Sequence, residues 1–126
     1  DGRHAGALAH EPPFDAALVD APCSNTGVLR RRPEARWRYD VASQRRLVRD
    51  QAAILATVTG LVRLDGRLVY SVCSIEPEEG EALVRAQPGL TLEREELILP
   101  SPGGGDGGYL ALLRRDPVQG VPHRDP

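Results

Sequence analysis

The sequence predicts an α/β fold in which a mainly parallel sheet is flanked by helices. Two near-continuous apolar runs, at residues 14–20 and 67–72, match strands that are buried on both faces, as in parallel sheets. Between them, residues 41–63 carry apolar side chains at spacings of three, four and seven, which is the pattern of an amphipathic helix. The order strand, helix, strand predicts a right-handed crossover between two neighbouring parallel strands.

Local signals give the limits of these first elements. Pro22 stops the first strand, and residues 21–39 then form a long loop rich in glycine, proline, asparagine and arginine. Asp40 or Ser43 is expected to cap the helix, and the Asp-Gly pair at 65–66 to end it. The side chains expected to face the core from this helix are those of Leu47, Val48, Leu55, Val58 and Val62.

The remainder of the chain predicts shorter elements. Pro77, with acidic residues around it, is typical of a first helical turn and predicts a short helix over 77–87. Strands are expected over 90–99 and 109–114, with a loose turn between them. The proline-containing segment 116–126 predicts a flexible tail.

Length and composition limit the classes of function. With 126 residues, the chain holds at most one domain and is small for an α/β enzyme with its own cofactor site. It contains no methionine, so we expect it to be a piece of a larger protein. No apolar run approaches the roughly 18 to 20 residues that span a bilayer, and no signal peptide is visible. Two cysteines without further pairs fit a reducing compartment, so we expect a cytoplasmic protein with no membrane contact.

Basic side chains are concentrated in one segment, although the net charge of -2 gives no overall attraction to nucleic acid. The segment contains five arginines within nine residues: Arg30, Arg31, Arg32, Arg36 and Arg38. It predicts a local contact with a polyanion, although a solvated loop would also explain such a run of charge.

The two cysteines each follow a predicted strand. Cys23 lies just after the run that ends at Asp20, and Cys73 directly after the second run. If the strands are parallel neighbours, about 4.8 Å apart, their carboxyl ends meet at the edge where ligands bind in open α/β sheets. Two thiols and the Asp20 carboxylate would then share one crevice, which suits covalent chemistry on an electrophilic ring better than metal binding, so no metal is expected. The simpler alternative makes Asp20 a turn former and Cys23 a small buried hydrophobe.

Several motifs together resemble one family. They are Asp-Ala-Pro-Cys-Ser at 20–24, the arginine-rich run at 26–38, Val-Tyr-Ser-Val-Cys-Ser at 69–74 with Pro-Glu-Glu at 77–79, and Gly-Gly-Tyr-Leu-Ala at 107–111. In this order they resemble the bacterial Sun/Fmu-type RNA (cytosine-5)-methyltransferases, which act on small-subunit (16S) ribosomal RNA and use S-adenosyl-L-methionine. The resemblance covers most of residues 1–115 and implies the carboxyl-terminal half of a Rossmann-like methyltransferase fold, with an antiparallel last strand. The amino-terminal RNA-binding domains and the first half of the catalytic fold would then be missing.

The resemblance also implies roles for the site residues. Carbon 5 of cytosine is a poor nucleophile until a group adds to carbon 6, and a thiolate is well suited to that addition. By resemblance, Cys73 is this nucleophile, and Cys23 serves the later release of the carbon-5 proton, either as a base or through a water. Asp20 would hydrogen-bond to nitrogen 3, where negative charge develops.

Cofactor and substrate contacts are implied less completely. Asp1 resembles the family's aspartate beside the adenine of S-adenosyl-L-methionine, and Asp20 is a second cofactor contact. The family's glycine-rich cofactor loop would lie before residue 1. Substrate RNA is expected to contact Pro22 and the arginine-rich loop, through Arg30, Arg31, Arg32, Arg36 and Trp37. One departure from the family is Val72, where threonine usually precedes the nucleophile.

Three alternatives remain open from the sequence. In a DNA-type cytosine-5 methyltransferase the nucleophile follows a proline, which would make Cys23 the attacking thiol. In a non-catalytic RNA-binding module the arginine loop would matter and the cysteines would be inert. A redox thiol pair is also conceivable, although such pairs usually occupy a Cys-X-X-Cys turn. Because half of the cofactor pocket would be absent, the 126 residues alone are not expected to turn over.

Overall fold

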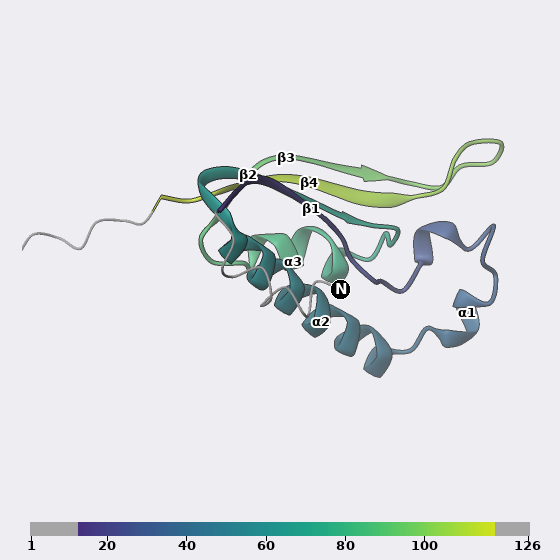
Figure 1. Ribbon diagram of the computed structural model, residues 1–126. Coiled ribbons are helices and arrows are strands. Elements are labelled where there is room, and N and C mark those ends of the chain that lie inside the picture. Colours follow the sequence, from purple (N-terminus) through teal and green to yellow (C-terminus); the bar gives the residue numbers. More distant parts are fainter. Residues whose placement is uncertain (1–12, 118–126) are drawn as a thin grey trace, which may run out of the picture.

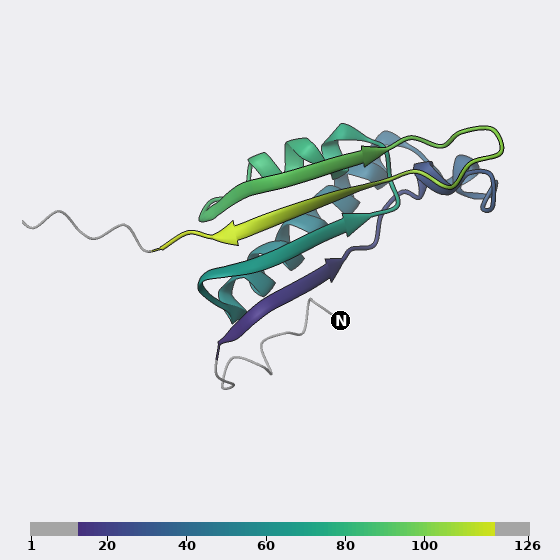
Figure 2. The same ribbon diagram turned by 90° about the horizontal axis from the view of Figure 1, so that it is seen from above.

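The computed structural model describes residues 13–117, in which four strands form one sheet. The strands are β1 (Phe14–Asp20), β2 (Val62–Val72), β3 (Leu90–Ile98) and β4 (Gly108–Arg115), and their order in the sheet is β1-β2-β4-β3. Strands β1 and β2 pair in parallel, whereas β4 runs antiparallel to both β2 and β3 (Figure 2). Three strands therefore share one direction and only the last is reversed, which confirms the predicted α/β fold with a mainly parallel sheet.

The long helix α2 (Val41–Leu61) connects β1 to β2 and lies with α3 (Glu81–Arg85) on one face of the sheet (Figure 1). Asp40 caps α2 as predicted, because its Oδ1 accepts a hydrogen bond of 2.8 Å from the backbone N–H of Ser43. The predicted loop over 21–39 contains two short elements, the 3-10 turn η2 (Thr26–Val28) and the single-turn helix α1 (Ala35–Arg38). The segment predicted as one helix over 77–87 divides into the 3-10 turn η3 (Pro77–Glu79) and helix α3.

The predicted end of the long helix is wrong. Helix α2 stops at Leu61, and β2 begins at once with Val62, so the Asp-Gly pair at 65–66 lies inside the strand. Asp65 has a left-handed φ of 60°, and the β1–β2 register shifts between Phe14 and Ala16. The pair therefore forms an irregularity within β2, which the sequence pattern cannot distinguish from the end of a helix.

The core lies between the sheet and α2. Leu55 of α2, Leu68 and Tyr70 of β2 and Leu113 of β4 are fully buried there. Of the residues predicted to face the core, Leu55 and Val62 are buried, the latter from the strand, whereas the other three are only half-buried. Two buried positions of α2 are glutamines, Gln44 and Gln51, and the hydrophobic pattern did not predict them.

The prediction that β1 is buried on both faces is also wrong. Strand β1 is an edge of the described sheet, and 71% of Leu18 is exposed. On β4, Leu110 is likewise exposed. A continuous apolar run indicates which side chains can be buried, but not what covers them.

The first residue of the predicted tail, Asp116, is part of the folded structure. Asp116 is held to the sheet, because its backbone N–H donates to the carbonyl of Gly89 at 2.9 Å. The rest of the predicted tail, from residue 118 onward, lies outside the described residues. None of the helices within residues 13–117 is long and apolar enough to cross a membrane.

A close approach at Gly27 links the loop after β1 to the turn before β4. The backbone N–H of Gly107 donates to the carbonyl of Gly27 at 2.8 Å, and a Cβ on Gly27 would collide with the Gly107 carbonyl group. Only a residue without a side chain fits this contact.

We therefore expect Gly27→Ala to lower the free energy of unfolding by about 1–3 kcal/mol, because the added methyl group forces the two backbone segments apart. Thermal unfolding followed by circular dichroism measures the effect. Gly60→Ala is the matched control, because a Cβ at Gly60 on α2 meets nothing within 4 Å. Equal melting temperatures for the two variants would contradict this account of the contact.

Candidate active site

The parallel pairing of β1 and β2 brings the two cysteines together. Backbone contacts hold the segment after β1 against β2 and the residue that follows it, because the N–H of Ala21 donates to the carbonyl of Ser71 and the N–H of Gly27 donates to the carbonyl of Cys73, both at 3.0 Å. The Sγ atoms of Cys23 and Cys73 lie 3.2 Å apart as free thiols, and either atom can be the donor. The structure thus brings together the two cysteines that the strand order predicted to be neighbours.

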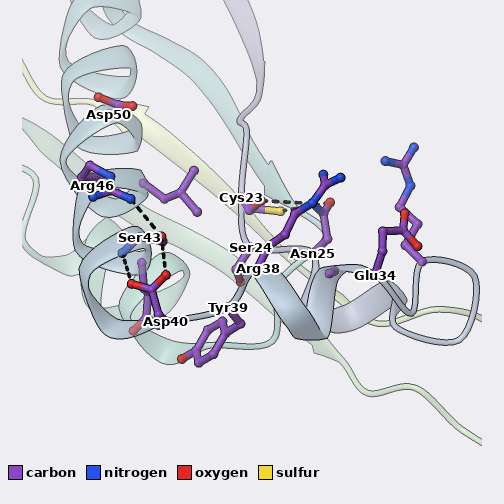
Figure 3. A pocket seen from close by; sticks show the side chains of 14 residues that line it. Cys23, Ser24, Asn25, Glu34, Arg38, Tyr39, Asp40, Ser43, Arg46 and Asp50 are labelled. Atoms are coloured by element: carbon purple, nitrogen blue, oxygen red, sulfur yellow. Dashed lines mark hydrogen bonds between the residues drawn. The ribbon is translucent and has the colours of Figure 1, made fainter.

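The two thiols have different surroundings. Cys23 is buried, and burial, reinforced by its hydrogen bond with Cys73, raises the pKa of its thiol to about 12. It lines a pocket of about 430 Å³ that extends to helix α2 (Figure 3). Cys73 is half-buried and lines a separate pocket of about 400 Å³ with Val28, Arg31 and Arg32. Cys23 is therefore a protonated thiol at neutral pH, whereas Cys73 is the more accessible of the two.

Asn25 contacts both cysteines and was missed in the sequence analysis. Its Nδ2 donates to the carbonyl of Cys23 at 3.2 Å, which fixes the orientation of the amide. Its Oδ1 then accepts a hydrogen bond of 2.9 Å from the Cys73 thiol. The residue has a left-handed φ of 62°, which asparagine tolerates better than most side chains. That tolerance is the only local signal that could have drawn attention to it.

Glu79 is the second residue that sequence reasoning missed. Its side chain is fully buried, and the sequence analysis treated it only as one of the acidic residues of a first helical turn. One oxygen, Oε1, accepts from the N–H of Ser24 at 2.8 Å and from Nε2 of Gln51 at 3.0 Å. The other, Oε2, accepts from the hydroxyls of Ser24 and Ser74, at 2.5 and 2.6 Å. No local pattern separates Glu79 from its exposed neighbour Glu78.

The other predicted site residues on this edge that the structure describes, Asp20 and Pro22, line neither of the two pockets. Asp20 ends β1 opposite Ser71 and is exposed. Pro22 is exposed, and its carbonyl accepts a hydrogen bond from Gln51 at 2.8 Å. Asp1 lies outside the described residues. No group of three His, Cys, Asp or Glu side chains that could hold a metal ion occurs within residues 13–117.

The arginine cluster divides into two groups. Arg32 lines both pockets, and Arg38 lines the larger one, close to Cys23 and Asn25 in Figure 3. Arg31 also lines the Cys73 pocket, but it forms an ion pair with Asp106, and Arg30 donates to the carbonyl of Gly104 at 3.3 Å. Two of the five arginines thus tie the loop to the turn between β3 and β4.

Helix α1 carries the remaining predicted substrate contacts. Arg36 and Trp37 are exposed there, Trp37 to 86%. They are accessible to a ligand that approaches the mouth of the site, but they do not reach into either pocket.

The raised pKa of Cys23 predicts a pH dependence of its reactivity. In a Cys73→Ser variant, alkylation of Cys23 by iodoacetamide at about pH 8 should be a hundredfold or more slower than in the urea-unfolded chain, because only the thiolate reacts. A raised pKa favours the protonated form, so the rate should rise only at strongly alkaline pH. The rate is followed by mass spectrometry across the pH range. A folded protein whose pH profile matches that of the unfolded chain would contradict the assignment.

Comparison with known proteins identifies the family of the chain. The sequence model of the family described as "16S rRNA methyltransferase RsmB/F" matches residues 1–99. The chain is 36% identical over 124 residues to the "Ribosomal RNA small subunit methyltransferase B" of Salmonella arizonae, covering 90% of the chain but only 29% of that protein's length. The solved structure of PH0851 matches with a TM-score of 0.81 and 30% identity, over 91% of the chain and 30% of that structure. That of "NSun6 from Pyrococcus horikoshii with SFG" matches with a TM-score of 0.69 and 29% identity, over 91% of the chain and 33% of that structure. The chain belongs to the RsmB/F family of 16S rRNA methyltransferases.

Proposed function

We propose that the complete protein methylates carbon 5 of a cytosine in 16S ribosomal RNA, with Cys73 as a covalent nucleophile. The observation that carries this proposal is the 3.2 Å approach of two unequal thiols at the carboxyl ends of neighbouring parallel strands. Family membership supports rRNA methylation as the overall reaction. The thiol pair supports carbon 5 of a pyrimidine as the atom that is methylated, because that carbon needs a nucleophile added next to it.

The difference between the thiols supports Cys73 as the attacking group. Cys73 lines an open pocket with Arg31 and Arg32, whereas burial raises the pKa of Cys23 to about 12 and keeps it protonated. The Cys73 thiolate donates its electron pair to carbon 6, the carbon 5–carbon 6 π pair becomes a carbon 4–carbon 5 double bond, and the carbon 4–nitrogen 3 π pair moves onto nitrogen 3, which takes up a proton. The resulting enamine makes carbon 5 nucleophilic, and the carbon 4–nitrogen 3 double bond forms again, with loss of that proton, once carbon 5 carries the methyl group. This assignment disfavours the DNA-type alternative, in which Cys23 would attack.

Release of the product reverses the addition. The carbon-5 proton leaves, its electron pair restores the carbon 5–carbon 6 double bond, and the bond to Cys73 Sγ breaks to regenerate the thiolate. Direct removal of that proton by Cys23 would require Cys23 to be ionised first. Its raised pKa therefore favours the route in which a water accepts the proton beside Cys23.

S-adenosyl-L-methionine supplies an electrophilic methyl group when it is bound. The described residues fit one side of such a site: Asp20 offers an exposed carboxylate at the end of β1, which is an edge strand of the described sheet. Asp20 lies shortly before Cys23 in the sequence, and in its protonated form its carboxyl group would donate a hydrogen bond to nitrogen 3 of the cytosine as negative charge develops there. Asp1 is the other expected cofactor contact, and it would lie beside the adenine of S-adenosyl-L-methionine.

The exposed arginines support RNA as the substrate. Arg32 and Arg38 at the pockets, with Arg36 and Trp37 on α1, present positive charge and an exposed ring at the mouth of the site. Contacts with phosphates position an RNA without reading its sequence. Choice of the target cytosine would then depend on the rest of the complete protein.

The covalent mechanism predicts opposite effects for the two cysteines. The complete protein is incubated with 16S rRNA and S-adenosyl-L-methionine, and a protein–RNA adduct that survives denaturation is scored on a gel. Cys23→Ala should accumulate the adduct because release is slowed, and Cys73→Ala should form none.

The reverse pattern would make Cys23 the nucleophile and restore the DNA-type mechanism. If both variants methylate normally, the cysteines are structural. If neither the wild type nor a variant methylates but RNA is still bound, the non-catalytic RNA-binding module replaces this proposal.

The arginine loop predicts a change in salt dependence. Arg32→Gln should weaken RNA binding severalfold, and the slope of log K against log salt should fall by about one, because one phosphate contact is lost. Fluorescence anisotropy at several salt concentrations measures both quantities. Arg63→Gln is the matched control, because Arg63 pairs with Asp15 at the opposite end of β1. Equal losses from the two variants would argue against a local contact.

A further inference from the structure

We propose that Glu79 is a positioning residue whose buried carboxylate clamps the segments that follow Cys23 and Cys73 and so sets the distance between the two thiols. The inference rests on the proposed function, because it assigns Glu79 a task in the chemistry of the cysteine pair. Within the described residues, Glu79 forms no hydrogen bond with either sulfur. It would therefore act through the serines that follow the two cysteines.

The contacts of Glu79 converge on both cysteine segments. Ser24 directly follows Cys23, and Ser74 directly follows Cys73. Ser24 donates two hydrogen bonds to the Glu79 carboxylate, one from its backbone N–H and one from its hydroxyl, and Ser74 donates one from its hydroxyl. The donor–acceptor distances are 2.5 to 2.8 Å. One carboxylate therefore connects two loops that are 50 residues apart in the sequence. A shift of either serine would carry the adjacent thiol with it.

The clamp is anchored in the rigid core. The carbonyl of Glu79 accepts a hydrogen bond of 2.8 Å from the hydroxyl of Tyr70, which is fully buried on β2. Gln51 of α2 donates both to Glu79 Oε1 and to the carbonyl of Pro22, on the same loop as Cys23. Sheet, helix and both loops are thus joined through one residue, by the side chain and the carbonyl of Glu79, and positions fixed in this way tolerate little displacement.

The chemistry of the contacts requires a carboxylate. An ionised carboxylate is acceptor-only, and all four contacts to Glu79 come from donors. A glutamine of the same shape would present an NH₂ group in place of one acceptor oxygen, and the serine hydroxyls would have to turn. A buried charge adds little net stability compared with a well-packed apolar side chain. Its contribution is therefore to the placement of the two serines.

The distance between the thiols can be measured without RNA or cofactor. In a glutathione redox buffer, one oxidised glutathione accepts two electrons from the Cys23–Cys73 pair, and one protein disulfide and two reduced glutathiones form. The equilibrium constant gives the effective concentration of one thiol toward the other, which depends on their geometry. In the complete protein, mass spectrometry of the peptides that carry the two cysteines reports the oxidised fraction.

Glu79→Gln and Ser74→Ala should each lower this effective concentration by about tenfold, because small displacements of paired groups reduce it steeply. Glu78→Gln is the matched control for charge, because Glu78 is the exposed neighbouring carboxylate. Leu113→Ala is the control for stability, because Leu113 is fully buried on β4 at the end away from the thiols. Both controls should keep the wild-type effective concentration, although Leu113→Ala lowers the melting temperature.

Two results would overturn the proposal. The first is that folded Glu79→Gln and Ser74→Ala keep the wild-type effective concentration of the thiols. The second is that Leu113→Ala lowers this effective concentration as much as they do, which would mean that Glu79 contributes only to stability. If Glu79→Gln does not fold, Ser74→Ala decides the question. Failure of the proposed function would appear separately, because an enzyme without methylation or adduct formation still gives a thiol equilibrium. In an active enzyme, Glu79→Gln should lower kcat and leave KM for RNA nearly unchanged.

Discussion

Parallel pairing between β1 and β2 is the constraint on which the site depends. The register places Val19 beside Tyr70 and Asp20 beside Ser71, and the backbone contacts of Ala21 with Ser71 and of Gly27 with Cys73 hold the following loop against β2. A slip of one residue would move every side chain of a strand to the opposite face of the sheet and separate the cysteines. The hydrophobic core beneath β2 fixes this register, which brings the two cysteine segments to the same edge of the sheet.

Two identical side chains acquire different properties from their surroundings in this site. Desolvation raises the pKa of Cys23, while the open pocket beside Cys73 leaves that thiol within reach of a ligand. Asn25 bridges them, with its amide orientation fixed by the carbonyl of Cys23. The same short loop therefore supplies one thiol and orients the other, which explains how so few residues can hold two groups with separate tasks.

The sequence predicted those features that local patterns determine. Strand β1, the start of α2 at its Asp40 cap and the meeting of the two cysteines follow from apolar runs, a capping residue and the strand–helix–strand order. The end of α2 could not be predicted, because Val62 and Arg63 satisfy the helical pattern but belong to β2, where Val62 pairs with Phe14 of β1. Glu79 and Asn25 were missed because each also contacts the other cysteine segment, far away in the sequence, through Ser24 and Cys73 respectively, and only the folded chain shows which acidic or amide side chain meets it.

The contact between Gly27 and Gly107 joins the arginine loop to the turn between β3 and β4, and the Arg31–Asp106 ion pair reinforces it. The loop therefore has a second support on a hairpin that carries neither thiol. Changes in the length or composition of residues 99–106 would shift the arginines relative to the cysteines while the β1–β2 pairing stays intact. Under the proposed function, changes in this hairpin would therefore alter how the arginines meet the RNA without altering the pairing that holds the two thiols.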